Sequence, residues 1–410
     1  MKVILGIGVL YALTIQSVSA QERFFQVQSI DTMKYSRDTA REKLNDSSFD
    51  QEIEIQVKNI AATGATHVAI ATPYDEEFLP FLKRWVAAAR FNHLKVWFRG
   101  NWSGWEGWFD YPPIDAATHL EKTKTFILSN RSLFEDGDVF TACPECENGG
   151  PGDPRKTQKI ADFRAFLVAE NTVVNNTFQI IDKKVTTHYY SMNGDVARVV
   201  MDKQTTIDLG GVITIDHYVA TPDLLITDIK NYISHTQGTV ALGEFGAPIP
   251  DINGPLSEKE QALWIDSALN KLVQIPQLVA INYWTNKGSS TALWNDDNTP
   301  RQGVAVLTTY FKPYTLSGVV RGKDGNALSD VLAIGKERSY ISKDGTYVLP
   351  VLEGETITFQ KQSYISKSVT ITGNNTKNIH QNIVLEMKSP SLFHQILFQV
   401  LHFFKSLHIW

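Results

Sequence analysis

Short runs of β-branched and other apolar residues alternate with amphipathic stretches from residue 21 to about residue 313 of this 410-residue chain. Their lengths and periodicities are typical of buried strands and of helices that cover a sheet. The predicted strands are Phe24–Ile30, His67–Ala71, Leu94–Arg99, Asp138–Thr141, Lys184–Tyr190, Val212–His217, Thr239–Glu244 and Val279–Trp284. The predicted helices are Gln51–Ala62, Glu76–Arg90, Ala116–Leu128, Gln158–Val174, Pro222–Ser234, Glu258–Leu272 and Arg301–Phe311.

This alternation predicts the α/β class, because parallel strands need crossover connections and these are right-handed. Eight units within residues 21–313 predict one (β/α)8 TIM barrel. The competing fold is an open doubly wound sheet. It is disfavoured because the first strand–helix junction, Ser29-Ile30-Asp31-Thr32, lacks a glycine-rich phosphate loop.

The pattern changes after Pro313, where short alternating runs separated by Asp-Gly turns predict a small C-terminal all-β sandwich over residues 314–387. Ser317-Gly318-Val319-Val320 opens this segment, Lys343–Leu349 supplies a DG-x-Y-x-L turn and strand, and Leu352-Glu353-Gly354 follows. The segment resembles carboxypeptidase-regulatory-like (transthyretin-like) modules. The resemblance implies a non-catalytic spacer or attachment domain.

Both ends of the chain have distinct compositions. Residues 1–20 are predicted to be a signal peptide, because Lys2 precedes an apolar stretch and Ser17–Ala20 ends in a small-x-small pattern. A retained membrane anchor is the alternative, and either implies a secreted or cell-surface protein. Residues 388–410 form an amphipathic tail that predicts membrane-surface or cell-envelope contact, with a partner-bound helix as the alternative.

Charge and cysteine usage limit the partners. The chain has 39 Lys+Arg against 44 Asp+Glu, and no basic stripe of the kind that predicts nucleic-acid binding. Cys143 and Cys146 have C-x-x-C spacing, but no second Cys/His pair completes a metal site. We therefore expect no metal or other cofactor, and free thiols are favoured over a local disulfide.

Catalytic groups of a (β/α)8 barrel lie at the carboxyl ends of its strands. Glu145 follows the fourth predicted strand, Glu244 ends the seventh, and aromatic residues follow several others. Hydrolysis of a glycosidic bond needs two carboxyl groups, one to protonate the leaving oxygen and one to attack or to activate water. The strand ends therefore predict carbohydrate chemistry. A metal-dependent hydrolase is disfavoured because the first strand end offers Asp31 without a His-x-His.

Three segments of the barrel resemble glycoside hydrolase family 5, the cellulase family of retaining enzymes. Val240–Gly246 is similar to that family's nucleophile strand, His217-Tyr218 to its His/Tyr site, and Tyr283-Trp284 to its eighth-strand tryptophan. The resemblance implies that Glu244 is the nucleophile, that Trp284 is a sugar platform, and that a glutamate after strand four is the acid/base.

The fourth strand end departs from the family pattern. The family carries Asn-Glu-Pro, whereas here Pro144 precedes Glu145. Glu145 is favoured as the acid/base because it lies four residues after Thr141, and Glu147 is the alternative. Asn101 or Asn148 would then replace the missing asparagine contact to the sugar.

Other predicted substrate-binding residues each have a structural alternative. Arg99 is predicted as a ligand or as a cation paired with Glu145 or Glu244. Trp102, with Trp105 and Trp108, is predicted to form an exposed aromatic platform, and packing within the loop is the alternative. The remaining substrate-binding predictions are Tyr190, His217, Tyr218 and Trp284, with core packing as the alternative.

The sequence as a whole predicts a secreted glycoside hydrolase that cleaves a β-linked polysaccharide or glycoconjugate by a two-glutamate retaining mechanism. The alternative is a non-catalytic carbohydrate-binding or surface-assembly protein built on an inactive barrel, because fold alone does not fix function.

Overall fold

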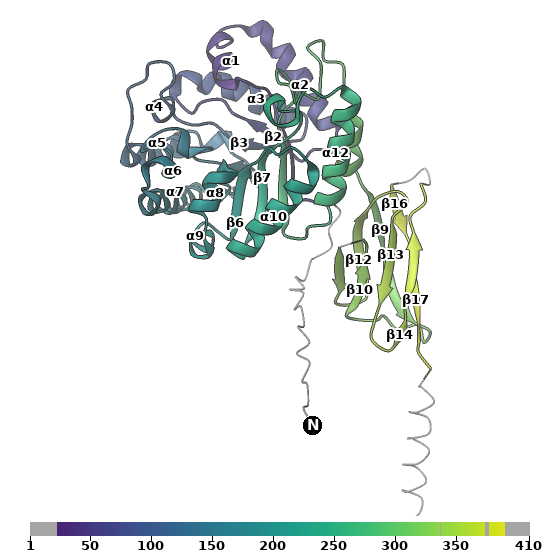
Figure 1. The fold of residues 1–410 in the computed structure, drawn as a ribbon. Coiled ribbons are helices and arrows are strands. Elements are labelled where there is room, and N and C mark those ends of the chain that lie inside the picture. The colour runs from purple at the N-terminus through teal and green to yellow at the C-terminus, as the bar shows by residue number, and fades with distance from the viewer. Residues whose placement is uncertain (1–22, 337, 374–376, 390–410) are drawn as a thin grey trace, which may run out of the picture. The chain divides into compact units, whose positions relative to one another are not determined.

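The computed structural model describes residues 23–336, 338–373 and 377–389. The predicted signal peptide and the predicted tail beyond residue 389 lie outside the described residues. The chain divides into a unit from Arg23 to Lys312 and a second unit that begins at Pro313 (Figure 1). Within the described ranges, no helix is both long enough and apolar enough to cross a membrane.

The first unit is built on one sheet of eight parallel strands in the order β4-β3-β2-β1-β8-β7-β6-β5. A backbone bridge joins Val139 of β4 to Thr186, in the segment that leads into β5, so the sheet closes on itself. The prediction of a (β/α)8 barrel is therefore confirmed. Its strands are β1 (Val27–Asp31), β2 (His67–Ile70), β3 (Lys95–Phe98), β4 (Val139–Phe140), β5 (Ser191–Asn193), β6 (Val212–Asp216), β7 (Thr239–Phe245) and β8 (Leu278–Tyr283).

One strand prediction is wrong. The segment Lys184–Tyr190 is not a strand, and β5 begins at Ser191, where it pairs with β6. The earlier segment bonds to β4 only around Thr186, and it then places Tyr189 inside the barrel with a 3% exposed side chain. Its apolar character comes from this interior aromatic residue and not from a strand ladder.

Helices surround the sheet, and most agree with the sequence pattern. The helix Glu258–Leu272 has the predicted bounds because Ser257 and Glu260 form a reciprocal capping box at its start. The helices are α1 (Ser36–Glu42), α2 (Asp50–Ala62), α3 (Leu79–Phe91), α4 (Ser103–Glu106), α5 (Ala116–Ser129), α6 (Pro154–Thr157), α7 (Ile160–Ile180), α8 (Gly194–Val200), α9 (Lys203–Asp208), α10 (Pro222–Thr236), α11 (Pro250–Asn253), α12 (Glu258–Leu272) and α13 (Gln302–Phe311). Short 3-10 turns lie at Ser47–Phe49, Glu76–Phe78, Arg131–Leu133 and Cys146–Asn148.

Side chains fill the inside of the barrel. A buried cluster takes one residue from most strands, among them Val27, Trp97, Val139 and Ala280, together with Tyr189. The interior of the barrel is therefore a packed core. The candidate catalytic side chains lie at the carboxyl ends of the strands, where the chain leaves this core.

The second unit is a β-sandwich of one antiparallel sheet and one mixed sheet, in which β16 and β17 pair in parallel with β9, and this confirms the predicted all-β fold. One sheet has the order β11-β10-β13-β15 and the other β12-β9-β17-β14, with β16 beside β9. Its buried residues include Val320, Leu349 and Phe359. The strands are β9 (Tyr314–Gly322), β10 (Val331–Ile334), β11 (Ser339–Ser342), β12 (Thr346–Val351), β13 (Thr356–Gln360), β14 (Tyr364–Ile365), β15 (Lys367–Thr370), β16 (Asn378–His380) and β17 (Ile383–Met387).

The barrel unit should fold without the sandwich. A chain that ends at Pro313 keeps α13, whose buried Leu307 and Phe311 complete the barrel core, and keeps the bond from Gln28 to the Phe311 carbonyl. We expect one cooperative thermal transition and an unchanged near-ultraviolet circular dichroism spectrum of the barrel aromatics. A control chain that ends at Arg301 lacks α13 and should lose that spectrum. Loss of the spectrum in the longer chain would contradict the prediction.

Candidate active site

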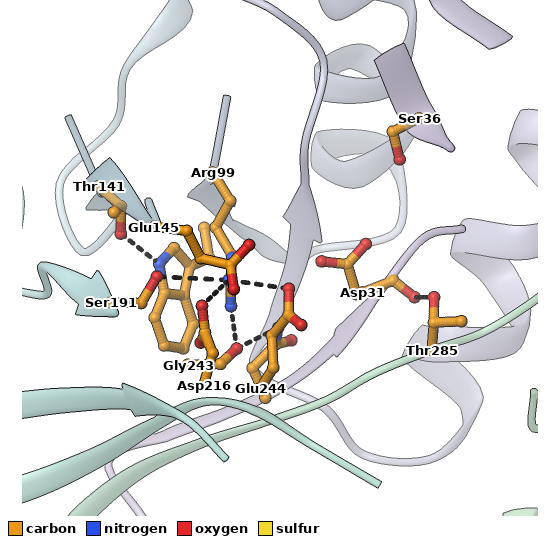
Figure 2. Close-up of polar contacts among 12 residues, drawn as sticks. Asp31, Ser36, Arg99, Thr141, Glu145, Ser191, Asp216, Gly243, Glu244 and Thr285 are labelled. Carbon is orange, nitrogen blue, oxygen red and sulfur yellow. Dashed lines mark hydrogen bonds and ion pairs between the residues drawn. The ribbon is translucent and has the colours of Figure 1, made fainter. Parts of the chain in front are cut away.

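Charged side chains from five strand ends meet at the carboxyl end of the barrel (Figure 2). Asp31 ends β1, Arg99 follows β3, Asp216 ends β6, Glu244 lies in β7, and Glu145 lies in the loop after β4. These positions are distant in the sequence, and the closed sheet alone brings them together. The result is one arginine surrounded by carboxyl groups.

Arg99 is the buried centre of this group, with a 4% exposed side chain. Its guanidinium lies 3.0 Å from Glu244 Oε1 and 3.1 Å from Asp216 Oδ2. It also donates to Ser191 Oγ at 3.4 Å and to the carbonyl oxygen of Gly243. Burial alone would lower the pKa of Arg99, but the Asp216 and Glu244 carboxylates hold that pKa above its usual value. Of its two predicted partners, Arg99 pairs with Glu244.

Glu244 receives hydrogen bonds on both carboxylate oxygens. Arg99 donates to Oε1, and the Tyr218 hydroxyl donates to Oε2 at 2.7 Å. The preceding residue is glycine, and a Cβ there would lie 2.7 Å from Ser191 Cβ. Gly243 therefore lets β7 approach the arginine site closely. Donors on both oxygens stabilise the ionised form of Glu244.

Glu145 has the opposite environment. Its half-buried carboxyl receives a side-chain bond from Asn148 at 3.1 Å. Burial and the negative charges of Glu244 and Glu147 raise the pKa of Glu145 to about 8. Glu145 and Glu244 point into the same space in Figure 2. Glu145 therefore keeps its proton at pH 7, beside a Glu244 side chain whose two oxygens both accept hydrogen bonds.

Glu147 does not share this arrangement. Its side chain is 3% exposed, and its Oε1 accepts a hydrogen bond from the Asn193 backbone N–H at 2.7 Å. Burial raises the pKa of Glu147, and the nearest opposing charge is that of Arg155. The geometry therefore favours Glu145 over Glu147 as a proton donor to anything that contacts Glu244.

A cavity of about 340 Å³ lies beside Glu244. The indole rings of Trp284 and Trp108 line it, and Trp284 is half-buried with Tyr218 edge-on to its ring at 6.0 Å. Asp31 also lines this cavity. Flat apolar rings beside hydrogen-bonding groups suit the two kinds of surface that a sugar presents.

The predicted platform is wrong for two of its three tryptophans. Trp102 and Trp105 are 4% and 2% exposed, because their loop packs under α5 and α7. The Trp102 indole donates to Thr123 Oγ1 at 3.0 Å, and Trp105 stacks on Phe166. Trp102 lines a different cavity, of about 840 Å³, between α3 and α5, whose lining includes none of the carboxyl groups described above.

Asn101 does not replace the missing family asparagine. Its side chain is 1% exposed, and its amide bonds Glu106, His119 and the Trp102 backbone N–H. These partners use both ends of the amide. Asn148 is exposed and contacts Glu145 itself, so Asn148 is the asparagine that the structure places beside the pair.

Tyr190 and His217 are buried and do not contact the side chains of Glu145 or Glu244 through any hydrogen bond among the described residues. The Tyr190 hydroxyl is buried and has no hydrogen-bond partner among the described residues. His217 Nε2 lies 2.8 Å from Asp228 Oδ2, and burial lowers the pKa of this histidine. His217 also lies edge-on to the Tyr232 ring, whereas the next residue, Tyr218, reaches Glu244.

Sequence reasoning missed two carboxyl groups of the site. Asp216 is 3% exposed, and burial raises its pKa well above the usual range. Burial likewise raises the pKa of Asp31 to about 7, and its Oδ1 atom has no partner among the described residues. Asp31 directly follows the first predicted strand and Asp216 is the penultimate residue of the sixth, so their position at strand ends was the signal that could have identified them.

Cys143 and Cys146 form a disulfide, so the expectation of free thiols is wrong. Their Cα atoms are 5.2 Å apart, within the normal range for this bond. Cys143 also lies near His119 and Glu170 in a group of potential metal ligands. A disulfide sulfur is not a thiolate ligand, and His119 is already paired with Glu170 at 2.8 Å.

No protein-family model and no curated protein matches the sequence. A GH5_18 protein of Bifidobacterium longum subsp. longum in complex with Manβ1-4GlcNAc has a TM-score of 0.54 at 14% identity, over 74% of this chain and 84% of its own. A GH5_18 protein of Bifidobacterium longum subsp. infantis has a TM-score of 0.52 at 14% identity, over 74% and 87%.

A third match is a Bacteroides uniformis β-glucuronidase, with a TM-score of 0.45 and 11% identity. It covers 82% of this chain, but this chain spans only 44% of the β-glucuronidase. The two GH5_18 likenesses show a shared (β/α)8 fold, and at 14% identity they show the fold alone.

The buried arginine should be essential for stability. Arg99→Met leaves several buried carboxyl groups without a cation, so we expect the free energy of unfolding at pH 8 to fall by about 3–5 kcal/mol in urea titrations. The loss should be smaller at pH 5, where protonation relieves the repulsion. Lys124→Met, which removes the exposed pair with Glu121, is the control and should cost less than about 1 kcal/mol. Equal costs for the two variants would contradict the role of Arg99.

Proposed function

We propose that the protein is a glycoside hydrolase that cleaves β-linked glycans by a retaining mechanism with Glu244 as nucleophile and Glu145 as acid/base. The observation that carries this proposal is the opposite environment of the two carboxyl groups. Arg99 and Tyr218 stabilise the Glu244 anion, whereas burial and neighbouring charge keep the proton on Glu145. A nucleophile and a general acid need these two protonation states.

In the first step, Glu145 gives its proton to the glycosidic oxygen while a Glu244 oxygen forms a bond to the anomeric carbon. The bond between that carbon and the leaving oxygen breaks, and the leaving group departs as an alcohol. Tyr218, which donates to Oε2, and Arg99, which donates to Oε1, orient the attacking carboxylate. The product of this step is a glycosyl ester on Glu244.

In the second step, the Glu145 carboxylate takes a proton from water, and the water oxygen displaces Glu244 from the anomeric carbon. The negative charge of Glu244 contributes to the raised pKa of Glu145, and the ester lacks that charge. The pKa of Glu145 therefore falls once the ester forms. This change suits the residue to act as a base in the second step.

The substrate is proposed to be a polysaccharide or glycoconjugate, with its sugar stacked on Trp284 in the 340 Å³ cavity. One structural neighbour, the GH5_18 protein of Bifidobacterium longum subsp. longum, is in complex with Manβ1-4GlcNAc, a β-linked glycan of this kind. We also propose that the protein is secreted or held at the cell surface. The Cys143–Cys146 disulfide supports this, because such bonds persist in oxidising compartments.

Substitutions of the two carboxyl groups should give different losses. Glu244→Gln should abolish turnover of aryl β-glycosides while glycan binding persists. Glu145→Gln should reduce kcat/KM by about 10²–10⁴-fold on unactivated substrates, with a smaller loss on dinitrophenyl glycosides, and azide should restore activity and yield a β-glycosyl azide. Glu147→Gln is the matched control in the same loop and should retain most activity. Full activity in both Glu244→Gln and Glu145→Gln would refute the proposal.

The pH dependence should report the proton on Glu145. Because the pKa of Glu145 is raised to about 8, the acid form persists through neutral pH and is lost as the pH rises through that value. We expect kcat/KM for unactivated substrates to fall above about pH 8, and the fall to be absent with dinitrophenyl glycosides, which need no proton donor. A basic limb that is identical for both substrates would argue against Glu145 as the acid.

A further inference from the structure

The acid/base candidate lies inside a small covalent ring. The disulfide between Cys143 and Cys146 closes the backbone around Pro144 and Glu145 alone. These are the two cysteines of the chain, so no other disulfide forms within it. Both are buried, with exposures of 0% and 2%.

The strand that precedes this ring is too short to position Glu145. The strand β4 contains two residues and ends at Phe140, five positions before Glu145. Glu244, in contrast, lies within the seven-residue strand β7 and takes its direction from the sheet ladder. The position of Glu145 must therefore be fixed by contacts of the loop itself.

The backbone at Glu145 is in the left-handed region, with φ 44° and ψ 46°. This conformation costs a non-glycine residue about 1–2 kcal/mol, and it persists where the surroundings impose it. The Glu145 N–H bonds the Ser191 carbonyl at 2.8 Å, and the Trp105 indole donates to the Cys146 carbonyl at 3.1 Å. One anchor is therefore on Glu145 itself and the other on the following residue, Cys146, which the disulfide ties to Cys143 on the other side of Glu145.

We propose that the Cys143–Cys146 disulfide is the positioning element for the acid/base carboxyl, so that the protein is an efficient proton donor only in its oxidised form. This inference rests on the proposed function. Reduction by a dithiol breaks the S–S bond and adds two electrons and two protons, which gives two thiols and the cyclic disulfide of the reductant. Glu145 then relaxes out of the left-handed region, whereas Glu244 and Arg99, which belong to other strand ends, keep their geometry.

The test compares two substrates of the full-length protein before and after reduction by dithiothreitol. A displacement of about 1 Å at a reacting group costs up to about 10²-fold, so kcat/KM for an unactivated β-glycoside should fall about 10- to 100-fold. For a dinitrophenyl β-glycoside, which needs no proton, it should change less than about twofold. The double variant Cys143→Ser, Cys146→Ser should show the same pattern without reductant and should not respond to reductant. This variant is the control for effects of the reductant elsewhere.

Three outcomes would overturn the inference: unchanged kcat/KM on the unactivated substrate, equal losses on both substrates, or a double variant that behaves as the oxidised protein. Thermal melts by circular dichroism distinguish an unfolded variant from a mispositioned carboxyl.

If the oxidised protein hydrolyses neither substrate, the proposed function fails, but the positioning role is still decided by ¹³C titration of the Glu145 carboxyl, assigned with Glu145→Gln. Reduction should then lower its midpoint by at least about one pH unit, as expected for a carboxyl that becomes more exposed. An unchanged midpoint refutes the positioning role.

Discussion

One buried guanidinium, that of Arg99, is the shared cation of several carboxyl groups at the carboxyl end of the barrel. The electrostatics of the site follow from this excess of carboxyl groups over cations. The charges of Asp216, Glu244, Asp31 and Glu145 all act on Arg99. A single cation cannot compensate four carboxylates that are buried or half-buried, so protons stay on some of these carboxyl groups. Glu244 combines a contact to the arginine with a hydrogen bond from the Tyr218 hydroxyl, so each of its two carboxylate oxygens has a donor.

The two central glutamates are held by different physical means. Glu244 is part of β7, where a register shift in the pairing with β6 and the absence of a side chain at Gly243 bring its carboxylate onto Arg99. Glu145 is held outside any strand, by a disulfide ring and an unusual backbone conformation. The sheet therefore positions Glu244 for its ion pair with Arg99. The disulfide positions Glu145, the neutral acid.

The sequence predicted the barrel well because strand and helix patterns are local properties of the chain. Its failures came from interactions between distant segments. The exposure of Trp102 and Trp105 is set by α5 and α7, so three tryptophans among glycines looked like a platform although two of them are core. Lys184–Tyr190 looked like a strand because Tyr189 fills the barrel interior.

In the candidate site, too, the features that depend on local sequence were predicted, and those that depend on distant segments were not. Glu145 and Glu244 were predicted because each stands at a strand end and one matches a known motif. The role of Asp216 was not predicted, because its partner Arg99 lies 117 positions away in the sequence. The opposite environments of the two glutamates also depend on which neighbours the fold supplies, and a strand-end residue does not reveal its neighbours.

The proposed mechanism also changes the partners of Arg99. When Glu244 becomes a glycosyl ester, Arg99 loses the carboxylate that lies 3.0 Å away, while Asp216 stays at 3.1 Å. A buried arginine without a counter-charge would be strongly destabilised, and the Glu145 carboxylate, which has given its proton to the leaving group in the same step, supplies that charge because it also acts on Arg99. Loss of the Glu244 charge lowers the pKa of Asp216 as well as that of Glu145, because that charge helps to raise both. The single arginine thus has an anionic partner in both halves of the proposed cycle, and the excess of carboxyl groups around it is what makes the exchange of partners feasible.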